Sequence, residues 1–186
     1  MSATREGWLV QAGRHTASLL KQATGLDVPE HHVSVGFPRG AQSRGGALGQ
    51  CWDGALSRDG QPQLFVSPII GETAQVLAVV LHEQIHAIVG SRAGHRGDFV
   101  KVARAVGFVR PWTRALPGGH LALSLNEIIA ELGTFPHPPL EPPFGPRPGS
   151  RLRLWQCGCP VKVRVASDDF AAHCDVCLGA FVRQGR

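Results

Sequence analysis

Apolar residues recur at helical spacing in four segments of the chain. A repeat near 3.6 residues buries one face of a helix, and it predicts helices over residues 5–24, 72–89, 98–106 and 121–132. Glycine follows the first, second and last of these segments, where it favours the end of a helix. The segment 72–89 is strongly apolar, so we expect its helix to be buried, with Thr73 as candidate N-cap.

Shorter apolar segments predict strands in the first half of the chain. Residues 32–37 alternate apolar and polar positions, as a half-buried strand does. Residues 50–52 and 64–66 lie on either side of a turn signal at 57–60, and together they predict a hairpin. A glycine-rich loop at 40–49 precedes this hairpin.

Residues 133–150 interrupt the pattern because they hold seven of the chain's 14 prolines. Neither a helix nor an interior strand tolerates so many prolines, so this segment is a stiff linker or an ordered wrap along the surface. The chain therefore divides into a first domain at 1–132, a Pro-rich linker at 133–150 and a small domain at 151–186. The small domain has two short strand patterns, 152–155 and 161–165.

The composition predicts a folded protein rather than a disordered or membrane protein. The chain has 186 residues, of which 43% are hydrophobic and 18% charged, enough apolar material for a core. No apolar run reaches the roughly 18–20 residues that a membrane span needs. The first residues do not have the basic and apolar regions of a secretory signal, so we expect a soluble cytoplasmic protein with no membrane association.

The positive charge is concentrated near the C-terminus. The formal net charge is +5, and residues 147–186 carry seven Lys or Arg against three acidic residues, a net of +4. A basic segment of this kind favours a polyanionic partner, and DNA bound through the basic C-terminal region is therefore one expectation.

A group of metal-ligating residues lies in the most apolar helix. His82 and His86 are four residues apart, so both imidazoles face the same side of the helix and can bind one zinc ion. Glu83 lies beside them and is placed to take a proton from a zinc-activated water. A catalytic zinc needs a third protein ligand, and the candidates are His95, which we favour, and Glu127 in the last predicted helix.

A second metal-ligating pattern lies in the small domain. Four of the five cysteines form two close pairs separated by 14 residues, which is typical of a tetrahedral structural zinc site. A domain this small buries little core, so a metal would hold it folded. The predicted ligands are Cys157, Cys159, Cys174 and Cys177.

Alternatives remain for these cysteines. His173 can replace one thiolate, or the four cysteines can be free or disulfide-bonded. Four thiolates on one zinc carry a net charge of −2, which would reduce the +4 of the basic segment to about +2 and weaken the case for nucleic acid. The fifth cysteine, Cys51, is predicted to be a buried core thiol.

The order of these features resembles the SprT-like zinc metalloprotease family, which includes the Spartan proteases of DNA–protein crosslink repair. The resemblance lies in the segments His82–His86 and His95–Phe99 and in a Cys-x-Cys…Cys-x-x-Cys ribbon introduced by Trp155. It implies an α+β fold: a zincin-like domain with a small antiparallel sheet and an active-site helix, followed by a small zinc ribbon. It also implies a catalytic zinc on the three histidines, Glu83 as catalytic acid and base, and a structural zinc on the ribbon cysteines.

The leading functional prediction is a zinc-dependent endopeptidase with a protein substrate. By the resemblance, the substrates include proteins associated with or crosslinked to DNA. Two other classes stay open: a nucleic-acid-binding zinc-ribbon protein with weak or lost proteolysis, motivated by the basic C-terminal region, and a zinc hydrolase acting on a small molecule or a cell-wall amide.

Overall fold

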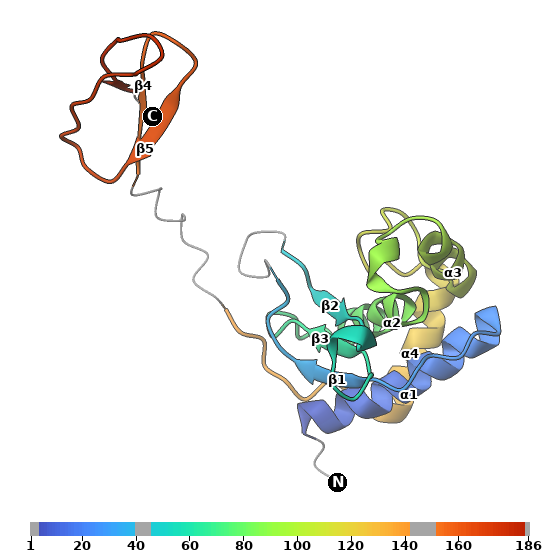
Figure 1. The fold of residues 1–186 in the computed structure, drawn as a ribbon. Coiled ribbons are helices and arrows are strands. Elements are labelled where there is room, and N and C mark those ends of the chain that lie inside the picture. The colour runs from blue at the N-terminus through green and yellow to red at the C-terminus, as the bar shows by residue number, and fades with distance from the viewer. Residues whose placement is uncertain (1–3, 40–45, 142–151, 185–186) are drawn as a thin grey trace. The chain divides into compact units, whose positions relative to one another are not determined.

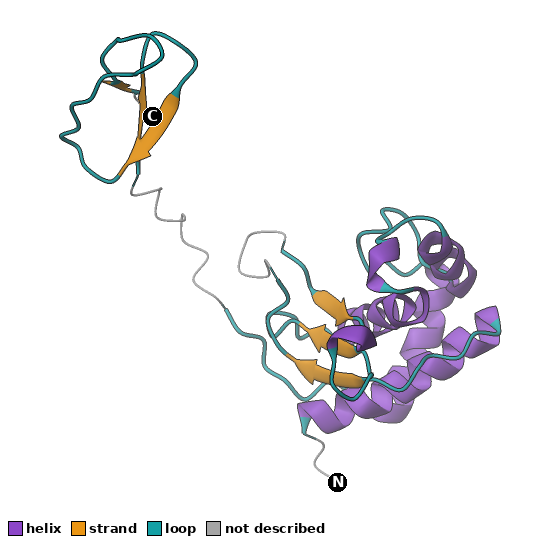
Figure 2. Cartoon of the chain, in the orientation of Figure 1, coloured by secondary structure: helices purple, strands orange, loops and turns teal. Residues whose placement is uncertain are grey.

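The computed structural model describes residues 4–39, 46–141 and 152–184. The chain separates into two compact units, Met1–Pro143 and Phe144–Arg186. The described residues form four α-helices and two three-stranded sheets, a mixed α+β fold (Figure 1). All four α-helices belong to the first unit, and the described part of the second unit contains strands and loops (Figure 2). None of the helices in the described residues is long and apolar enough to cross a membrane.

The helices follow the apolar periodicity closely. Their bounds are α1 Arg5–Thr24, α2 Thr73–Val89, α3 Asp98–Val106 and α4 Gly119–Leu132, with single 3-10 turns at η1 Gly54–Leu56 and η2 Ser91–Ala93. Gly25 ends α1 in a left-handed conformation that a residue with a Cβ adopts at a cost. The predicted cap Thr73 is wrong, because α2 starts after Glu72 and the Thr73 hydroxyl instead accepts a hydrogen bond from the Phe135 N–H at 3.0 Å.

The first unit contains a sheet in which the hairpin pairing is confirmed. The strands are β1 His32–Val35, β2 Gly49–Trp52 and β3 Gln63–Val66, in the spatial order β1-β3-β2. β2 pairs antiparallel with β3, but β1 pairs parallel with β3. The expectation of an antiparallel sheet is therefore wrong for one of its two pairs. The chain reverses once between β1 and β2 and again between β2 and β3, so the first and third strands run in the same direction.

The two faces of this sheet have different surroundings. Side chains from one face join the core formed with α1 and α2, among them Val33, Cys51, Leu64 and Val66. The alternate positions, including Trp52 and Phe65, lie on the face directed away from these helices. The predicted burial of the Cys51 thiol is confirmed.

The first part of the Pro-rich segment lies along the first unit. Phe135 is buried and its ring makes an edge contact with Trp8, whose indole N–H donates to the Gly133 carbonyl. Further along, the Leu140 N–H donates to the Pro68 carbonyl at 2.8 Å. Residues 133–141 therefore wrap the surface, and the remaining predicted linker residues, 142–150, lie outside the described residues.

The second unit is a small antiparallel sheet with long loops. Its strands are β4 Arg153–Gln156, β5 Lys162–Val165 and β6 Val182–Arg183, in the order β5-β4-β6. The first two match the predicted strands to within one residue at either end. Trp155 on β4 is buried, and its ring makes an edge contact with the ring of Phe170. The two rings form a small aromatic core. The Phe170 ring also lies near that of Phe181, and a unit this small buries little further core.

Candidate metal centres

Helix α2 carries the first candidate site inside the core. Every residue from Val76 to His86 is buried, including His82 and Glu83. The 3.6-residue repeat places His82 and His86 one turn apart on one face. Because buried polar groups are costly without partners, this arrangement indicates that a group outside the helix satisfies them.

For His82 and His86, one such group is the imidazole of His95. The chain leaves α2 at Gly90, passes through η2 and returns His95 to the helix. The Nε2 atom of His95 lies 3.0 Å from Nε2 of His82 and 3.2 Å from Nε2 of His86. Nitrogens bound to one tetrahedral zinc at 2.0–2.1 Å lie about 3.3 Å apart, which is close to these separations.

The donor chemistry of the three imidazoles also fits a cation. In a neutral imidazole each ring nitrogen is either a donor or an acceptor, so three converging Nε2 atoms cannot satisfy one another fully. A metal ion accepts a lone pair from all three. Burial lowers the pKa of His82 to about 3 and that of His86 to about 4, and it also lowers the pKa of His95. The imidazoles are therefore neutral at pH 7, the form that binds metals.

The ring of Phe99 packs against all three imidazoles. This ring is fully buried on α3 and lies 4.4–4.9 Å, centroid to centroid, from the imidazoles of His82, His86 and His95. Because an aromatic ring has no hydrogen-bonding atoms, it limits the rotation of the imidazoles without competing for their nitrogens. The apolar wall also keeps the dielectric low.

The Glu83 carboxylate, one residue after His82 on α2, lies against strand β2. The backbone N–H of Cys51 donates to it, and a Cβ at position 49 would lie 2.5 Å from Glu83 Oε1 and 2.5 Å from Val79 Cγ1. Gly49 therefore makes the space that the carboxylate occupies. Burial raises the pKa of Glu83 to about 8, so its proton affinity is far above that of an exposed glutamate.

The neighbouring thiol is inert. Burial, together with the charges of Glu83 and Asp53, raises the pKa of Cys51 to about 12. At neutral pH the group is an uncharged core side chain, and thiols are nucleophilic as thiolates. Cys51 contributes to the site through its backbone N–H, which donates to Glu83.

Asp53 anchors the loop that carries His95. Its carboxylate accepts hydrogen bonds from the Ser91 N–H at 2.9 Å and from the Ser91 hydroxyl at 2.6 Å. These two bonds are the main reason that the pKa of Asp53 is lowered. Strand β2 and the loop after α2 are thus joined beside the site.

The alternative third ligand lies elsewhere. Glu127 is exposed on α4 and is not among the residues that the described structure gathers into a metal-binding group, which are His82, His86 and His95.

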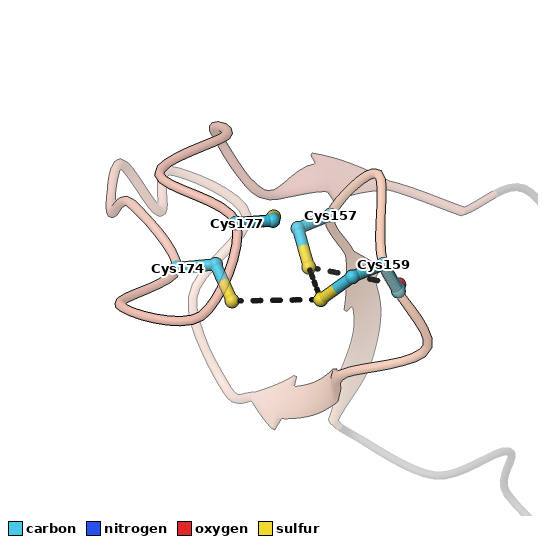
Figure 3. A group of neighbouring side chains, drawn as sticks. All are labelled: Cys157, Cys159, Cys174 and Cys177. Carbon is cyan, nitrogen blue, oxygen red and sulfur yellow. Dashed lines mark hydrogen bonds between the residues drawn. The ribbon is translucent and has the colours of Figure 1, made fainter.

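The four predicted cysteines of the second unit form a second group. They come from the loop after β4 and from the turn Cys174–Cys177, and their sulfurs face one another (Figure 3). The Sγ atoms of Cys157 and Cys159 are 3.1 Å apart, and those of Cys159 and Cys174 are 3.7 Å apart. Sulfurs on a tetrahedral zinc at about 2.3 Å lie about 3.7 Å apart, whereas a disulfide is near 2.05 Å. All five cysteines of the chain are free thiols, and the cluster can hold a metal ion.

The turn between Cys174 and Gly179 is closed by backbone hydrogen bonds and favours the thiolate of Cys177. The Leu178 N–H donates to the Cys174 carbonyl at 2.7 Å, and the Cys174 N–H donates to the Gly179 carbonyl at 2.9 Å. A hydrogen bond from the Gly179 N–H lowers the pKa of Cys177 to about 7, whereas burial raises that of Cys157 to about 12. His173 is exposed and lies outside the cluster.

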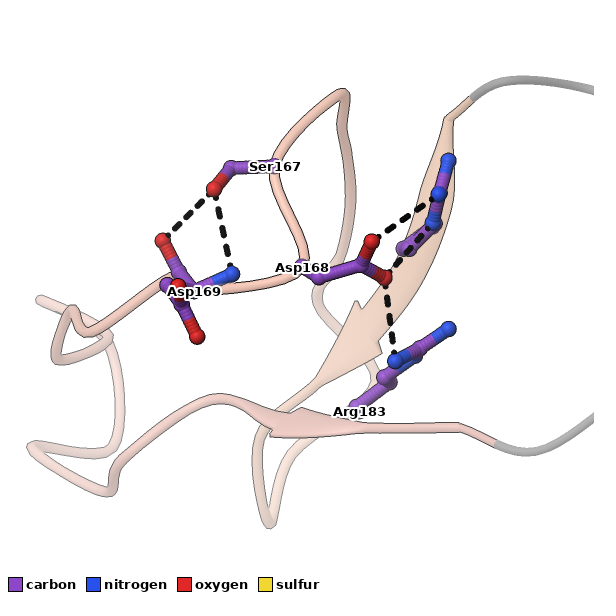
Figure 4. Close-up of polar contacts among 5 residues, drawn as sticks. Ser167, Asp168, Asp169 and Arg183 are labelled. Carbon is purple, nitrogen blue, oxygen red and sulfur yellow. Dashed lines mark hydrogen bonds and ion pairs between the residues drawn. The ribbon is translucent and has the colours of Figure 1, made fainter.

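Part of the basic charge of the second unit is neutralised locally. The Asp168 carboxylate accepts two hydrogen bonds from Arg153, at 2.8 and 3.0 Å, and pairs with Arg183 at 3.0 Å (Figure 4). These contacts lower the pKa of Asp168 and join β4 to β6 through one acidic side chain. Two of the basic residues predicted to attract a polyanion therefore share a carboxylate. Arg147 and Arg151 lie outside the described residues.

Three groups that shape the histidine site were not predicted from the sequence: Gly49, the Cys51 N–H and Asp53. Each reaches the site through a contact between residues 49–53, in or directly after β2, and residues 30 or more positions later, and no local pattern indicates such a contact. Comparisons with protein-family models, with curated proteins and with solved structures found no match to this chain.

Proposed function

We propose that this chain is a zinc-dependent endopeptidase of the SprT-like type, with a zincin-like first unit. The observation that carries the proposal is the convergence of three neutral imidazoles beside a buried carboxylate on the same helix. Three histidines leave one tetrahedral position open, which is the pattern of catalytic rather than structural zinc sites. The resemblance to SprT-like proteases rests on these same residues and on the cysteine ribbon.

In this proposal His82, His86 and His95 hold the zinc ion. Zinc, when bound, polarises the scissile carbonyl and makes an adjacent water more acidic. The carboxylate of Glu83 takes a proton from the attacking water onto one Oε atom and later transfers it to the leaving amine nitrogen. Its raised proton affinity suits both steps, and the Cys51 N–H and Gly49 hold it in place.

The test is the substitution Glu83→Gln, with Glu127→Gln as a matched control on exposed α4. We expect Glu83→Gln to retain zinc and to reduce cleavage of unfolded casein by at least about 100-fold, the scale of a lost acid–base group. Glu127→Gln should cleave like the wild type. Cleavage by Glu83→Gln at the wild-type rate would show that this carboxylate has no catalytic role.

The cysteine cluster supports a second part of the proposal, a structural zinc. Four sulfur ligands leave no open position, so this zinc would stabilise the second unit rather than take part in chemistry. Elemental analysis should give two zinc ions in the wild type and one in His95→Ala. Two zincs in His95→Ala would return Glu127 to consideration as the third ligand.

A nucleic-acid-binding role for the second unit is the alternative function. Lys162 and Arg164 are exposed on the same face of β5, and neither shares the carboxylate that holds Arg153 and Arg183. Such a surface would deliver DNA-associated proteins to the first unit. Contacts to phosphates make binding weaken steeply with salt, so a shallow salt dependence, or no DNA binding at low salt, would count against this role.

A further inference from the structure

The face of the first sheet that points away from the helices carries a hollow of about 540 Å³. Strands β2 and β3 supply Trp52 and Phe65, the segment after β1 supplies Phe37 and Arg39, and η1 supplies Leu56. Phe37, Trp52 and Leu56 are exposed by 47%, 43% and 71%. We call this cavity the sheet hollow. Large apolar side chains that gather in one concavity are typical of binding sites.

The walls of the sheet hollow are held in place before any ligand arrives. The ring of Phe65 packs directly against the backbone of Gly36. A Cβ at position 36 would lie 2.8 Å from Phe65 Cδ1, so only glycine leaves room for the ring. The Gln50 side chain accepts a hydrogen bond from the Arg39 N–H at 2.9 Å. Gln63 donates to the Ser57 hydroxyl at 3.0 Å. Preorganised walls lower the entropic cost of binding.

The charge of the sheet hollow disfavours a polyanion. Its lining carries one guanidinium, Arg39, and one carboxylate, Asp53, so the two formal charges cancel. Both Asp53 oxygens and the Gln50 amide oxygen are already hydrogen-bonded within the protein. What the lining offers a ligand is therefore mainly aromatic and aliphatic surface.

We propose that the sheet hollow binds a large aromatic or aliphatic side chain of an unfolded polypeptide substrate, away from the scissile bond. This inference rests on the proposed protease function. In β2 the residues alternate: Cys51 faces Glu83, whereas Gln50 and Trp52 face the hollow. Glu83 and the hollow thus lie on opposite faces of β2. Asp53, which lines the hollow, holds Ser91 at the start of the turn that leads to His95, so the hollow adjoins the segment that carries the third imidazole.

The test measures binding without cleavage, using the full chain with Glu83→Gln. The probes are fluorescein-labelled peptides of Gly, Ser and Gln, about 12 residues long so that they span the hollow when extended. One peptide has a central Phe and its twin has Ala. Fluorescence anisotropy should show that the Phe peptide binds about tenfold more tightly, the scale of burying one large apolar side chain.

Two variants and a control locate the binding. Phe37→Ala and Leu56→Ala, both outside the strands, should each weaken binding of the Phe peptide about fivefold. Leu123→Ala, on α4 and 65% exposed, should have no effect. Equal binding of the two peptides, or hollow variants that bind like the control, would overturn the proposal.

An oligothymidylate of similar length tests the other class of ligand. If the oligothymidylate binds, Phe37→Ala and Leu56→Ala show where. If these variants weaken its binding more than they weaken binding of the Phe peptide, the sheet hollow is a nucleic-acid site and the proposal is wrong. These measurements do not depend on catalysis. A failure of the proposed function appears separately, as unchanged casein cleavage in Glu83→Gln.

Discussion

The Asp53 carboxylate holds Ser91 by two hydrogen bonds, one from the backbone N–H at 2.9 Å and one from the hydroxyl at 2.6 Å. Ser91 is the first residue of the turn that leads from α2 to His95. The position of the third imidazole therefore depends on an aspartate that is hydrogen-bonded to Ser91 and whose charge also acts on His86. Groups that position metal ligands typically change metal affinity by about 10–100-fold when removed.

Asp53→Ala should speed the release of zinc from the histidine site by about tenfold, the low end of that range because Asp53 acts through Ser91. Zinc released into a coloured chelator should appear in two phases. Only the phase from the histidine site should accelerate, and the phase from the cysteine site serves as an internal reference.

Asp59→Ala is the matched control for this prediction. Asp59 lies on the same connection between β2 and β3, is exposed, and accepts hydrogen bonds from the Gln61 N–H and from His32. An equal acceleration in both variants would show that Asp53 acts only through general destabilisation. Hydrogen exchange of the Ser91 amide in the metal-free protein gives a second reading, and it should increase in Asp53→Ala alone.

Gly49→Ala should damage catalysis more than metal binding. The added Cβ would lie 2.5 Å from both Glu83 Oε1 and Val79 Cγ1, so the carboxylate must move or the strand must shift. Overpacking of this kind costs about 1–3 kcal/mol of stability. We expect two zinc ions per chain to remain and casein cleavage to fall about as far as in Glu83→Gln.

Gly119→Ala provides the comparison for the Gly49 variant. A Cβ at Gly119, the first residue of α4, meets no atom within 4 Å, and alanine favours a helix. This variant should keep full activity with unchanged or slightly higher thermal stability. If Gly49→Ala is also fully active, the close approach of β2 to Glu83 does not position the carboxylate.

The helices and the pairing of His82 with His86 on one helix face were predictable because their signals are local. His82 and His86 lie on one face by spacing alone, and the glycines that end α1 and α2 follow directly in the sequence. The parallel pairing of His32 with Gln63 was not predictable, since it depends on how two chain reversals pack in space. Phe37 continues the apolar alternation of β1 but lies beyond the strand, where it lines the sheet hollow instead.

The two candidate metal sites should respond differently to acid. A lowered imidazole pKa means that protons compete with zinc only near that lower value, so the histidine site should hold zinc with little change from pH 7 to about 5. Protons compete with zinc for the cysteine ligands at a higher pH than for the imidazoles, because the pKa of Cys157 is raised to about 12. Dialysis at pH 5 should therefore leave one zinc per chain in the wild type.

His95→Ala identifies the zinc that remains. Dialysed at the same pH, this variant should lose nearly all of its zinc, since its histidine site has only two ligands. One zinc retained by His95→Ala at pH 5 would mean that the cysteine site is the acid-resistant one, contrary to the order expected from the lowered imidazole pKa values and the raised pKa of Cys157.

Leu178 adopts a left-handed backbone conformation, with φ of 57°, at the turn that bears Cys174 and Cys177. A residue with a Cβ pays roughly 1–2 kcal/mol for this conformation, and glycine avoids that cost but loses about 0.5–1 kcal/mol of chain entropy. The Leu178 side chain is 79% exposed, so its packing contributes little to the stability of the turn. Leu178→Gly should therefore stabilise the metal-bound turn by about 1 kcal/mol.

This gain is measurable as zinc affinity of the cysteine site, in a His95→Ala background that removes the other site. About 1 kcal/mol corresponds to an approximately fivefold tighter zinc affinity. Leu178→Ala separates the two possible causes, because it removes the exposed apolar group but keeps the Cβ that opposes a positive φ. If alanine tightens zinc binding as much as glycine does, the gain comes from losing the leucine side chain, and the backbone of Leu178 carries no cost that limits metal binding.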